Sequence, residues 1–347
     1  MIFSQKKRAL WVNNNESAAT LKLLFVGDVM LGRLVNDELN RRDVDYPWGD
    51  TLPFFKEADL RICNLECVIS DRGRPWSRTP KVFHFRLESK NLCTLKAAEI
   101  DAVSLANNHT LDFDYSAMFD MLRQLDKAGV SHAGAGHNLE AAANPAIINL
   151  NGSRIGFISF TDNQPEWEAR PSDPGLFYVP TDLRDARAIQ LLELVRHTRQ
   201  RVDLLVVATH WGGNWGYAPP PEHVQFGRAL ITAGAEIVIG HSAHVFRGVE
   251  IFHGGLIIYS AGNFIDDYAV DSEERNDQSF IFVVDTDGAK LLRLRLRPTV
   301  IRNFQAKLAC EEEEFEIAAK MTKLCAQLGT RLFWDNQAHC LIAEVMR

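Results

Sequence analysis

The sequence AEIVIGHSAH, residues 235–244, places two histidines directly after a short apolar run. An apolar run that gives way to Gly240 is typical of a buried strand ending in a turn. The neutral histidine ring offers a nitrogen lone pair and is the commonest metal ligand among side chains. The stretch therefore predicts a strand with His241 and His244 at its carboxyl end, and either a metal site or an ordinary surface pair of histidines.

The same construction recurs at four other places in the chain. Apolar runs at 21–27, 58–65, 101–106 and 203–208 are followed within a residue or two by Asp28, Glu66, Asn108 and His210. In open α/β sheets, ligand sites form outside the carboxyl ends of the strands. Together with His241, these side chains would be delivered to one place, which predicts a metal centre.

Each of these side chains also has an ordinary structural interpretation. Asp28 suits a helix N-cap, Glu66 a solvated charge, Asn108 a turn, and His210 a hydrogen-bonded core imidazole. The metal interpretation depends on all of them standing at the same end of five strands.

The rest of the pattern predicts a layered α/β sheet with helices on both faces. Helices are expected at 88–98, 115–128, 181–197 and 311–330 and after Pro219-Pro220-Pro221, and hairpins at 145–160, 248–260 and 279–296. Residues 71–86 and 162–180 are expected to form loops, the second of them over the site. We expect a loose leader at 1–20, one domain at 21–300 and a C-terminal helical extension at 301–347.

Composition excludes several classes of protein. The net charge of -7 over 347 residues leaves no basic stripe for nucleic-acid binding. The sequence has neither a run long enough to span a membrane nor a signal-peptide apolar region, so we expect a cytoplasmic location. Six cysteines without a CxxC pair are then expected to be reduced thiols. The oligomeric state is not indicated.

Six segments together resemble the poly-γ-glutamate capsule biosynthesis (CapA) family, a branch of the calcineurin-like metallophosphoesterases. They are VGDVMLGR (26–33), NLE (64–66), ANNH (106–109), HWG (210–212), GHSAH (240–244) and YSAGNF (259–264). The resemblance extends from about residue 21 to about residue 268. It implies an α/β fold of four layers, αββα, followed by the C-terminal helical segment, and it implies a dinuclear-type metal centre and hydrolytic activity.

The resemblance also implies roles for individual residues. Asp28 and His244 would hold one ion, Asn108, His210 and His241 the other, and Glu66 would bridge them. His109 matches a histidine that protonates the leaving group, so His109 and Asp28 are the candidate catalytic residues. The chain departs from the phosphoesterase pattern at Met30, where a histidine would complete an Asp-x-His pair. The first site is therefore expected to be one nitrogen ligand short.

The donor set also points to a class of metal and of substrate. Imidazole, carboxylate and amide donors suit one or two ions of Mn²⁺, Zn²⁺ or Fe. Arg33 and Arg247 are candidates to clamp an anionic substrate, with structural ion pairs as the alternative. Trp211, Trp215 and Tyr217 are candidates for an aromatic rim, although core packing is expected for at least one tryptophan.

Three functions are compatible with these residues. The first is a metal-dependent hydrolase acting on an anionic phosphoester or a γ-glutamyl, peptide-like substrate. The second is a metal-dependent peptide epimerase with bases on the two sides of the reacting carbon. The third is a non-catalytic component of polyglutamate capsule assembly, for which the acidic net charge is unfavourable.

Overall fold

The computed structural model describes residues 20–288 and 290–345. Apart from Thr20, the predicted leader at 1–20 lies outside the described residues. Within these ranges, no helix combines the length and apolar character needed to cross a membrane.

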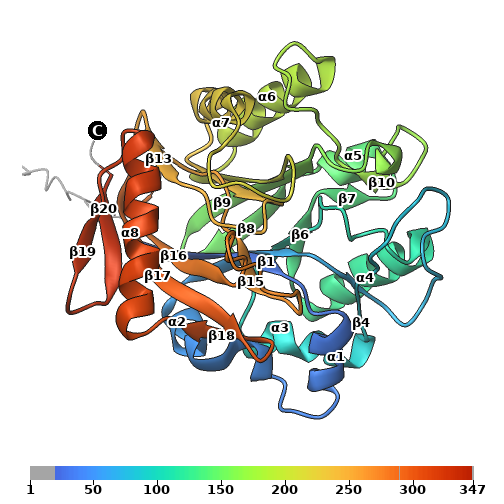
Figure 1. Ribbon diagram of the computed structural model, residues 1–347. Coiled ribbons are helices and arrows are strands. Elements are labelled where there is room, and N and C mark those ends of the chain that lie inside the picture. Colours follow the sequence, from blue (N-terminus) through green and yellow to red (C-terminus); the bar gives the residue numbers. More distant parts are fainter. Residues whose placement is uncertain (1–19, 289, 346–347) are drawn as a thin grey trace, which may run out of the picture.

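Two large β-sheets form the centre of the molecule (Figure 1). The ten-stranded sheet contains, in spatial order, β19 (Phe333–Asp335), β20 (Cys340–Glu344), β17 (Lys290–Arg302), β16 (Gln278–Asp287), β1 (Thr20–Val29), β2 (Leu60–Leu65), β5 (Ala102–Ser104) and β6 (Ser131–Ala133), with β15 (Asn263–Ile265) on β1 and β18 (Gln305–Leu308) on β17. The six-stranded sheet contains β13 (Val249–Phe252), β14 (Gly255–Ile258), β12 (Ile237–His241), β11 (Leu204–His210), β9 (Ser153–Thr161) and β8 (Ala146–Leu150). Two small pairs join β10 (Gly175–Leu176) to β7 (Ala135–Gly136), and β3 (Val68–Ile69) to β4 (Arg86–Leu87).

The alternation of side chains along β1 explains why the sheets stack. Leu23 and Phe25 point into a core between the two sheets, whereas Leu24 and Val26 point into a second core on the outer face. Successive residues of a strand face opposite sides, so a strand that is apolar at every position must be covered on both faces. The ten-stranded sheet is therefore an inner layer.

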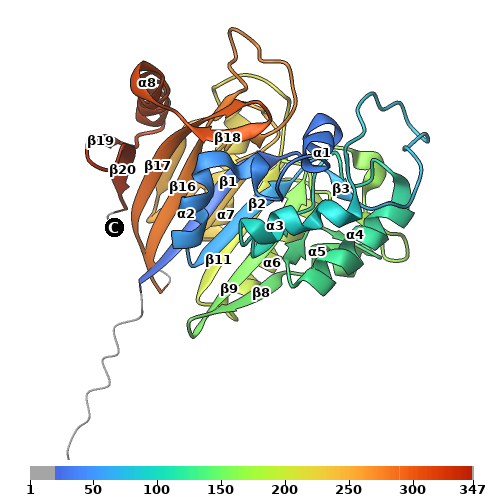
Figure 2. The ribbon, with the colours of Figure 1, turned by 90° about the horizontal axis from the view of Figure 1, so that it is seen from below.

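Helices cover the outer face of each sheet, which gives four layers, αββα (Figures 1 and 2). The outer core of the ten-stranded sheet is closed by α1 (Arg33–Leu39), α2 (Leu52–Glu57), α3 (Cys93–Ala97) and α4 (Asp114–Ala128). The six-stranded sheet is covered by α6 (Ala186–Arg199) and α7 (Pro221–Ala233), with the short α5 (Leu139–Ala143) at its edge. The fold class predicted from the sequence, a four-layer α/β sandwich, is confirmed.

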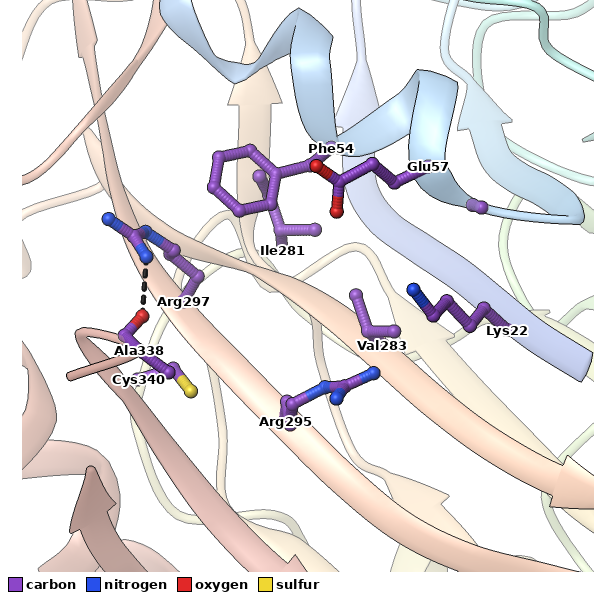
Figure 3. A pocket seen from close by; sticks show the side chains of 10 residues that line it. Lys22, Phe54, Glu57, Ile281, Val283, Arg295, Arg297, Ala338 and Cys340 are labelled. Carbon is purple, nitrogen blue, oxygen red and sulfur yellow. Dashed lines mark hydrogen bonds between the residues drawn. The ribbon is translucent and has the colours of Figure 1, made fainter. Parts of the chain in front are cut away.

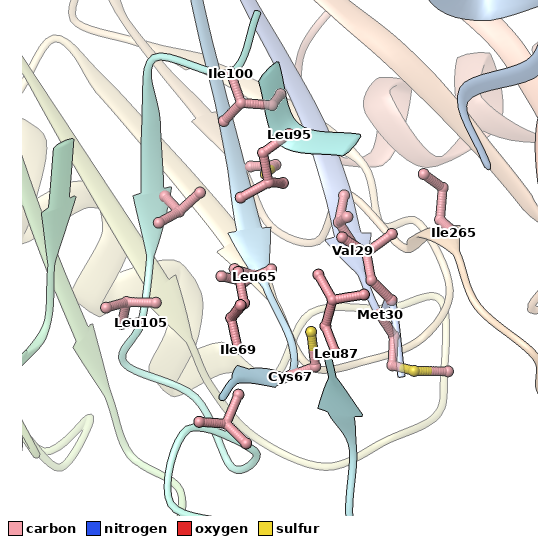
Figure 4. Close-up of a cluster of buried hydrophobic side chains, with 14 of the residues drawn as sticks. Val29, Met30, Leu65, Cys67, Ile69, Leu87, Leu95, Ile100, Leu105 and Ile265 are labelled. Carbon is pink, nitrogen blue, oxygen red and sulfur yellow. The ribbon is translucent and has the colours of Figure 1, made fainter. Parts of the chain in front are cut away.

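The outer core reaches up to the ends of β1, β2 and β15. Val29, Leu65 and Ile265 lie together there with Met30, all of them buried (Figure 4). The sulfur of Met30 accepts the Gly32 N–H at 3.1 Å. This packing holds the ends of β1, β2 and β15 in place.

Most predicted elements are present with shifted bounds. The turn at Asn151-Gly152 has positive φ at both residues, 48° and 85°, as a tight hairpin requires, and α4 ends before Gly129 with φ 75°. The predicted helix at 181–197 begins only at Ala186, because the Asp185 side chain caps it by accepting the Arg187 N–H.

Other elements differ in type or were not predicted. The helix expected at 88–98 is present, with a first turn of 3₁₀ type, Ser89–Leu92, followed by α3, and two further 3₁₀ turns occupy Tyr46–Thr51 and Pro165–Trp167. The short strands β6, β15 and β18 to β20 were not predicted. They are only three to five residues long, which is too short for a clear apolar pattern, and each pairs with a neighbouring strand.

The segment after residue 301 contains the expected helix, α8 (Glu311–Gln327), and also strands. Ile317 and Met321 of α8 pack into the core between the sheets, and β20 pairs with β17. This segment is the red, left-hand part of Figure 1. The predicted domain boundary at residue 300 falls inside β17 and stays a prediction.

Candidate metal centre

The carboxyl ends of parallel strands from both sheets converge on one place. Asp28 is the penultimate residue of β1 and pairs in register with Asn64 of β2, which places Glu66 just beyond the strand. His210 and His241 are the last residues of β11 and β12 and lie directly opposite each other. The seam between the two sheets therefore brings carboxylates from one sheet to imidazoles from the other.

The distances show a compact cluster. Ligand atoms of Asp28, Glu66 and His244 all lie within 4.8 Å of one another. His241 Nδ1 lies 3.0 Å from Asp28 Oδ1. The Asn64 amide donates to Asp28 Oδ1 at 2.8 Å and lies 3.4 Å from His210 Nδ1. Asn108 and His109 line the cavity above, together with His244, so the structure brings every predicted ligand to this region.

The turn after β12 holds His244 in a strained conformation. Ser242 has φ 93° and His244 has φ 56°, both in the left-handed region that β-carbon-bearing residues rarely occupy. His244 Nδ1 lies 2.9 Å from Asn263 Oδ1. This contact places the Nδ1 proton on the Asn263 side and leaves Nε2 as the lone-pair donor.

Several buried oxygens of the cluster have no hydrogen-bond donor within the described ranges. They are Asp28 Oδ2, both carboxylate oxygens of Glu66 and the side-chain oxygen of Asn108. Buried polar groups are almost always paired, and unpaired buried charge is unfavourable. A divalent cation held by Asp28, Glu66 and His244 would supply the missing partner of the two carboxylates, so the residues present fit a metal ion.

The electrostatics of the cluster also suit a cation. Burial and the neighbouring Asp28 raise the pKa of Glu66 well above its ordinary value. Burial lowers the pKa of His210 to about 3 and that of His109 to about 4, so both rings are neutral near pH 7. Burial by itself raises the pKa of Asp28. Its hydrogen bond to His241 and the charges of the surrounding histidines outweigh this effect, so the pKa of Asp28 lies below the ordinary value. Neutral imidazoles beside a carboxylate are the state that a metal ion binds.

His109 is fixed by a carboxylate and an aromatic ring. Its Nδ1 lies 2.7 Å from Asp112 Oδ2, and Lys81 Nζ contacts the other Asp112 oxygen at 3.1 Å. The Phe85 ring stacks on the imidazole with a centroid distance of 3.9 Å. His109 Nε2 points toward the cluster and lies 3.7 Å from Glu66 Oε1. This arrangement presents Nε2 to anything that binds at the centre.

A cavity of about 550 Å³ opens above the centre. Its lining includes Arg33, Lys81, His109, Trp215, His244 and Tyr268. Arg33 forms an ion pair with Asp267 and lies 4.8 Å from the Phe85 ring centroid. The cavity therefore combines two cationic side chains with aromatic walls beside the ligands.

Arg247 is placed differently from Arg33. Its guanidinium is buried and donates to the carbonyl oxygens of Gly216 and Trp215 at 2.8 and 3.1 Å, and it is not among the residues that line the cavity. Here it holds the loop after β11, and its role in substrate binding stays a prediction. Trp215 is half exposed at the cavity, whereas Trp211 is fully buried and donates to the Tyr259 carbonyl.

A second cavity, of about 290 Å³, lies on the outer face of the ten-stranded sheet between α2 and β17 (Figure 3). Lys22, Arg295 and Arg297 line it together with an apolar floor of Ile281 and Val283. It contains no histidine and only the Glu57 carboxylate. Its residues do not form a ligand cluster, so we place the chemistry at the first cavity.

The residues that sequence reasoning missed are those that hold the ligands. Asn64 binds Asp28, Asn107 donates to Asn64 Oδ1 at 2.9 Å, and Asn263 binds His244. All three lie inside the segments quoted from the sequence, and Asn64 and Asn107 are two positions and one position away from a predicted ligand. Only Asn64, between Cys63 and Leu65, carried a signal of its own, because an amide inside an apolar strand is buried and needs partners.

The chain matches a known protein family over most of its length. A model of the family described as "Bacterial capsule synthesis protein PGA_cap" matches residues 22–268. The chain is 31% identical over 323 residues to a Mycobacterium tuberculosis protein named "Probable polyglutamine synthesis accessory protein", with 88% of this chain and 83% of that protein covered.

Two further relatives come from Bacillus. "Capsule biosynthesis protein CapA" of Bacillus anthracis is 29% identical, covering 75% of this chain and 65% of its own length. "PGA biosynthesis protein CapA" of Bacillus subtilis is 28% identical, covering 71% and 63%. Among solved structures, a hypothetical protein from Thermus thermophilus aligns with a TM-score of 0.43 at 14% identity, over 83% of this chain and 96% of that one.

Proposed function

The chain belongs to the PGA_cap family of bacterial capsule synthesis proteins, and from this premise we propose that it is a metal-dependent hydrolase of anionic substrates. The substrate class is a phosphoester or a γ-glutamyl, peptide-like bond. The observation that carries the proposal is the group of unpaired buried oxygens of Asp28, Glu66 and Asn108 beside neutral imidazoles. A divalent ion bound there would acidify a water molecule and polarise a phosphoryl or carbonyl oxygen.

The residues around the centre supply the remaining functions. Arg33 and Lys81 at the cavity attract and orient a negatively charged substrate. His109 keeps its Nδ1 proton on Asp112, so Nε2 can take a proton from the attacking water and return it to the leaving group. Because burial lowers the pKa of His109 to about 4, the ring begins the reaction neutral at pH 7.

Replacing His109 tests the catalytic part of the proposal. We expect His109→Asn to keep its metal content and to lose about 10²- to 10⁴-fold in turnover, because a proton carrier is removed and no ligand is lost. The assay uses untagged protein reconstituted with Mn²⁺ or Zn²⁺, nitrophenyl phosphate mono- and diesters, and γ-glutamyl peptides. Chiral amino-acid analysis of the peptides separates hydrolysis from epimerisation.

The matched control is His132→Asn, because His132 lies on β6 and contacts Asp126, away from the centre. It should behave as the wild type does. Turnover of His109→Asn at the wild-type rate would remove His109 from the mechanism, and loss of metal together with activity would make it a ligand.

A non-catalytic role in capsule polymer assembly is the second candidate. It is favoured by the printed names of the relatives, which describe capsule biosynthesis and an accessory protein of polymer synthesis. Saturable binding of polyglutamate, with no turnover of any substrate in the presence of metal, would support this role over hydrolysis.

A further inference from the structure

Asp266 is a buried carboxylate that none of the roles above uses. It follows β15, which pairs in parallel with the end of β1: Asp28 lies opposite Asn263, and Val29 lies opposite Ile265. The Met30 N–H also donates to the Ile265 carbonyl at 2.8 Å. Asp266 directly follows Ile265, the last residue of β15, so its backbone lies beside the end of β1 that carries Asp28.

One oxygen of Asp266 is accounted for and the other is not. Oδ1 accepts the Tyr268 N–H at 3.0 Å, whereas Oδ2 is buried and has no partner in the described ranges. The residue as a whole is only 4% exposed. Arg33, at the start of α1, pairs with the neighbouring Asp267 rather than with Asp266.

The charges of Asp266 and of the cluster act on each other. Burial, together with Asp267 and Asp28, raises the pKa of Asp266 to about 8, and Asp266 in turn helps to raise the pKa of Glu66. Three buried carboxyls, Asp28, Glu66 and Asp266, thus affect one another, and in the described ranges no lysine or arginine forms an ion pair with any of them. Such a group is unfavourable unless a cation binds it.

The other polar side chains around Asp266 already have tasks at the site. Asn263 fixes His244, Asp267 fixes Arg33, and Tyr268 lines the cavity. The segment 263–268 therefore supports the site through Asn263, Asp267 and Tyr268, and Asp266 contributes a buried oxygen that has no hydrogen-bond partner in the described ranges.

We propose that Asp266 is a further ligand of the metal centre, binding through Oδ2 on the side formed by Asp28, Glu66 and His244. The inference rests on the proposed metal centre. It gives that side three carboxylates and one imidazole, an oxygen-rich donor set that suits Mn²⁺ better than Zn²⁺. The fourth donor also compensates for the thioether at Met30, which is buried and accepts the Gly32 N–H.

The test measures Mn²⁺ binding to the full-length variant Asp266→Asn. Titration calorimetry gives the affinity and the number of ions bound, and electron paramagnetic resonance gives the spectrum of the bound ion. Asparagine retains an oxygen for the Tyr268 N–H and removes the charge. We expect about 10- to 100-fold weaker binding of Mn²⁺ or the loss of one ion per chain, with a changed spectrum. The control Asp271→Asn removes an exposed carboxylate of the same loop and should bind as the wild type does.

Thermal unfolding without metal separates ligation from a structural role. Metal-free Asp266→Asn should unfold at about the same temperature as the wild type, because the amide keeps the size of the side chain and its contact with the Tyr268 N–H, and its unfolding temperature should rise less on adding Mn²⁺. If Asp266→Asn does not fold, Asp266→Ser takes its place. Equal Mn²⁺ affinity and spectrum in wild type and variant would overturn the assignment of Asp266 alone, whereas a wild type that binds no divalent ion would overturn the metal centre itself.

Discussion

Amides organise the ligands at the scale of single residues. Asn64 and Asn107 form a chain of hydrogen bonds that ends on Asp28, and Asn263 does the same for His244. Such partners set the orientation and the tautomer of a ligand, and they are worth as much to a site as a further donor atom. The centre therefore consists of the candidate ligands, which are the residue types that sequence analysis recognises, and of the amides that hold those ligands in place.

Asn263→Ala should weaken metal binding without removing a ligand. The substitution takes away the acceptor that holds the Nδ1 proton of His244, so the ring loses its fixed orientation, and we expect about 10- to 100-fold lower affinity for Mn²⁺. Titration calorimetry measures the effect, with Asn149→Ala on the exposed side of β8 as the control. Unchanged affinity in Asn263→Ala would show that His244 is not a ligand or needs no orientation.

The candidate ligands could be predicted from the sequence because their signal is local. Asp28, His210 and His241 each follow an apolar run, and the carboxyl ends of neighbouring parallel strands meet at one edge. The partners of these ligands were not accessible, because Asp112 contacts His109 only after a turn, and Asn263 reaches His244 only when β15 pairs with β1. Arg247 illustrates the same limit: its charge was compatible with an anion clamp or a structural role, and only the structure shows that its guanidinium donates to the carbonyl oxygens of the loop after β11.

At the scale of elements, α7 is joined to the end of β11 by a buried histidine. The His223 ring stacks on Trp211 at 4.6 Å, and its Nδ1 has no partner in the described part of the chain. Gly212 makes this possible, since a β-carbon there would lie 2.5 Å from His223 Cε1 and the residue has φ 74°. The contact between His223 and Trp211 joins α7 to the start of the loop that carries Trp215.

His223 should make the fold sensitive to acid. Burial lowers its pKa to about 4, against an ordinary value near 6.5, so between these pH values the unfolded chain binds more protons than the folded one. Stability must then fall as the pH falls through this window. The variant His223→Phe keeps a ring stacked on Trp211. When the pH is lowered from 7 to 5, we expect its free energy of unfolding to fall by about 1–2 kcal/mol less than that of the wild type.

Urea unfolding at the two pH values measures this difference, and the buried histidines of the centre contribute equally to both proteins. His197→Phe, at an exposed position of α6, is the control and should follow the wild type. A wild-type pH dependence in His223→Phe would mean that the ring is protonated in the folded protein.

At the scale of the whole molecule, the four layers place the centre at the seam between two sheets. One sheet supplies Asp28 and Glu66, and the other supplies His210 and His241. The apolar periodicity of the strands predicted a layered sheet with helices on both faces, and the resemblance to the family implied the two stacked sheets. The short edge strands and the way residues 301–347 enter the central core depend on contacts distant in sequence. The C-terminal segment is thus helical as expected and also part of the sheet.

The metal content of untagged protein, measured by elemental mass spectrometry, tests the central claim most directly. We predict at least one divalent transition metal ion per chain in the wild type, and loss of most of it in His210→Ala and in His241→Ala. Both variants should retain the far-ultraviolet circular dichroism of the wild type, and His253→Ala, in the turn after β13, should retain the metal. A metal-free wild type that takes up no ion on reconstitution, or full metal retention in both histidine variants, would contradict a metal centre at this seam.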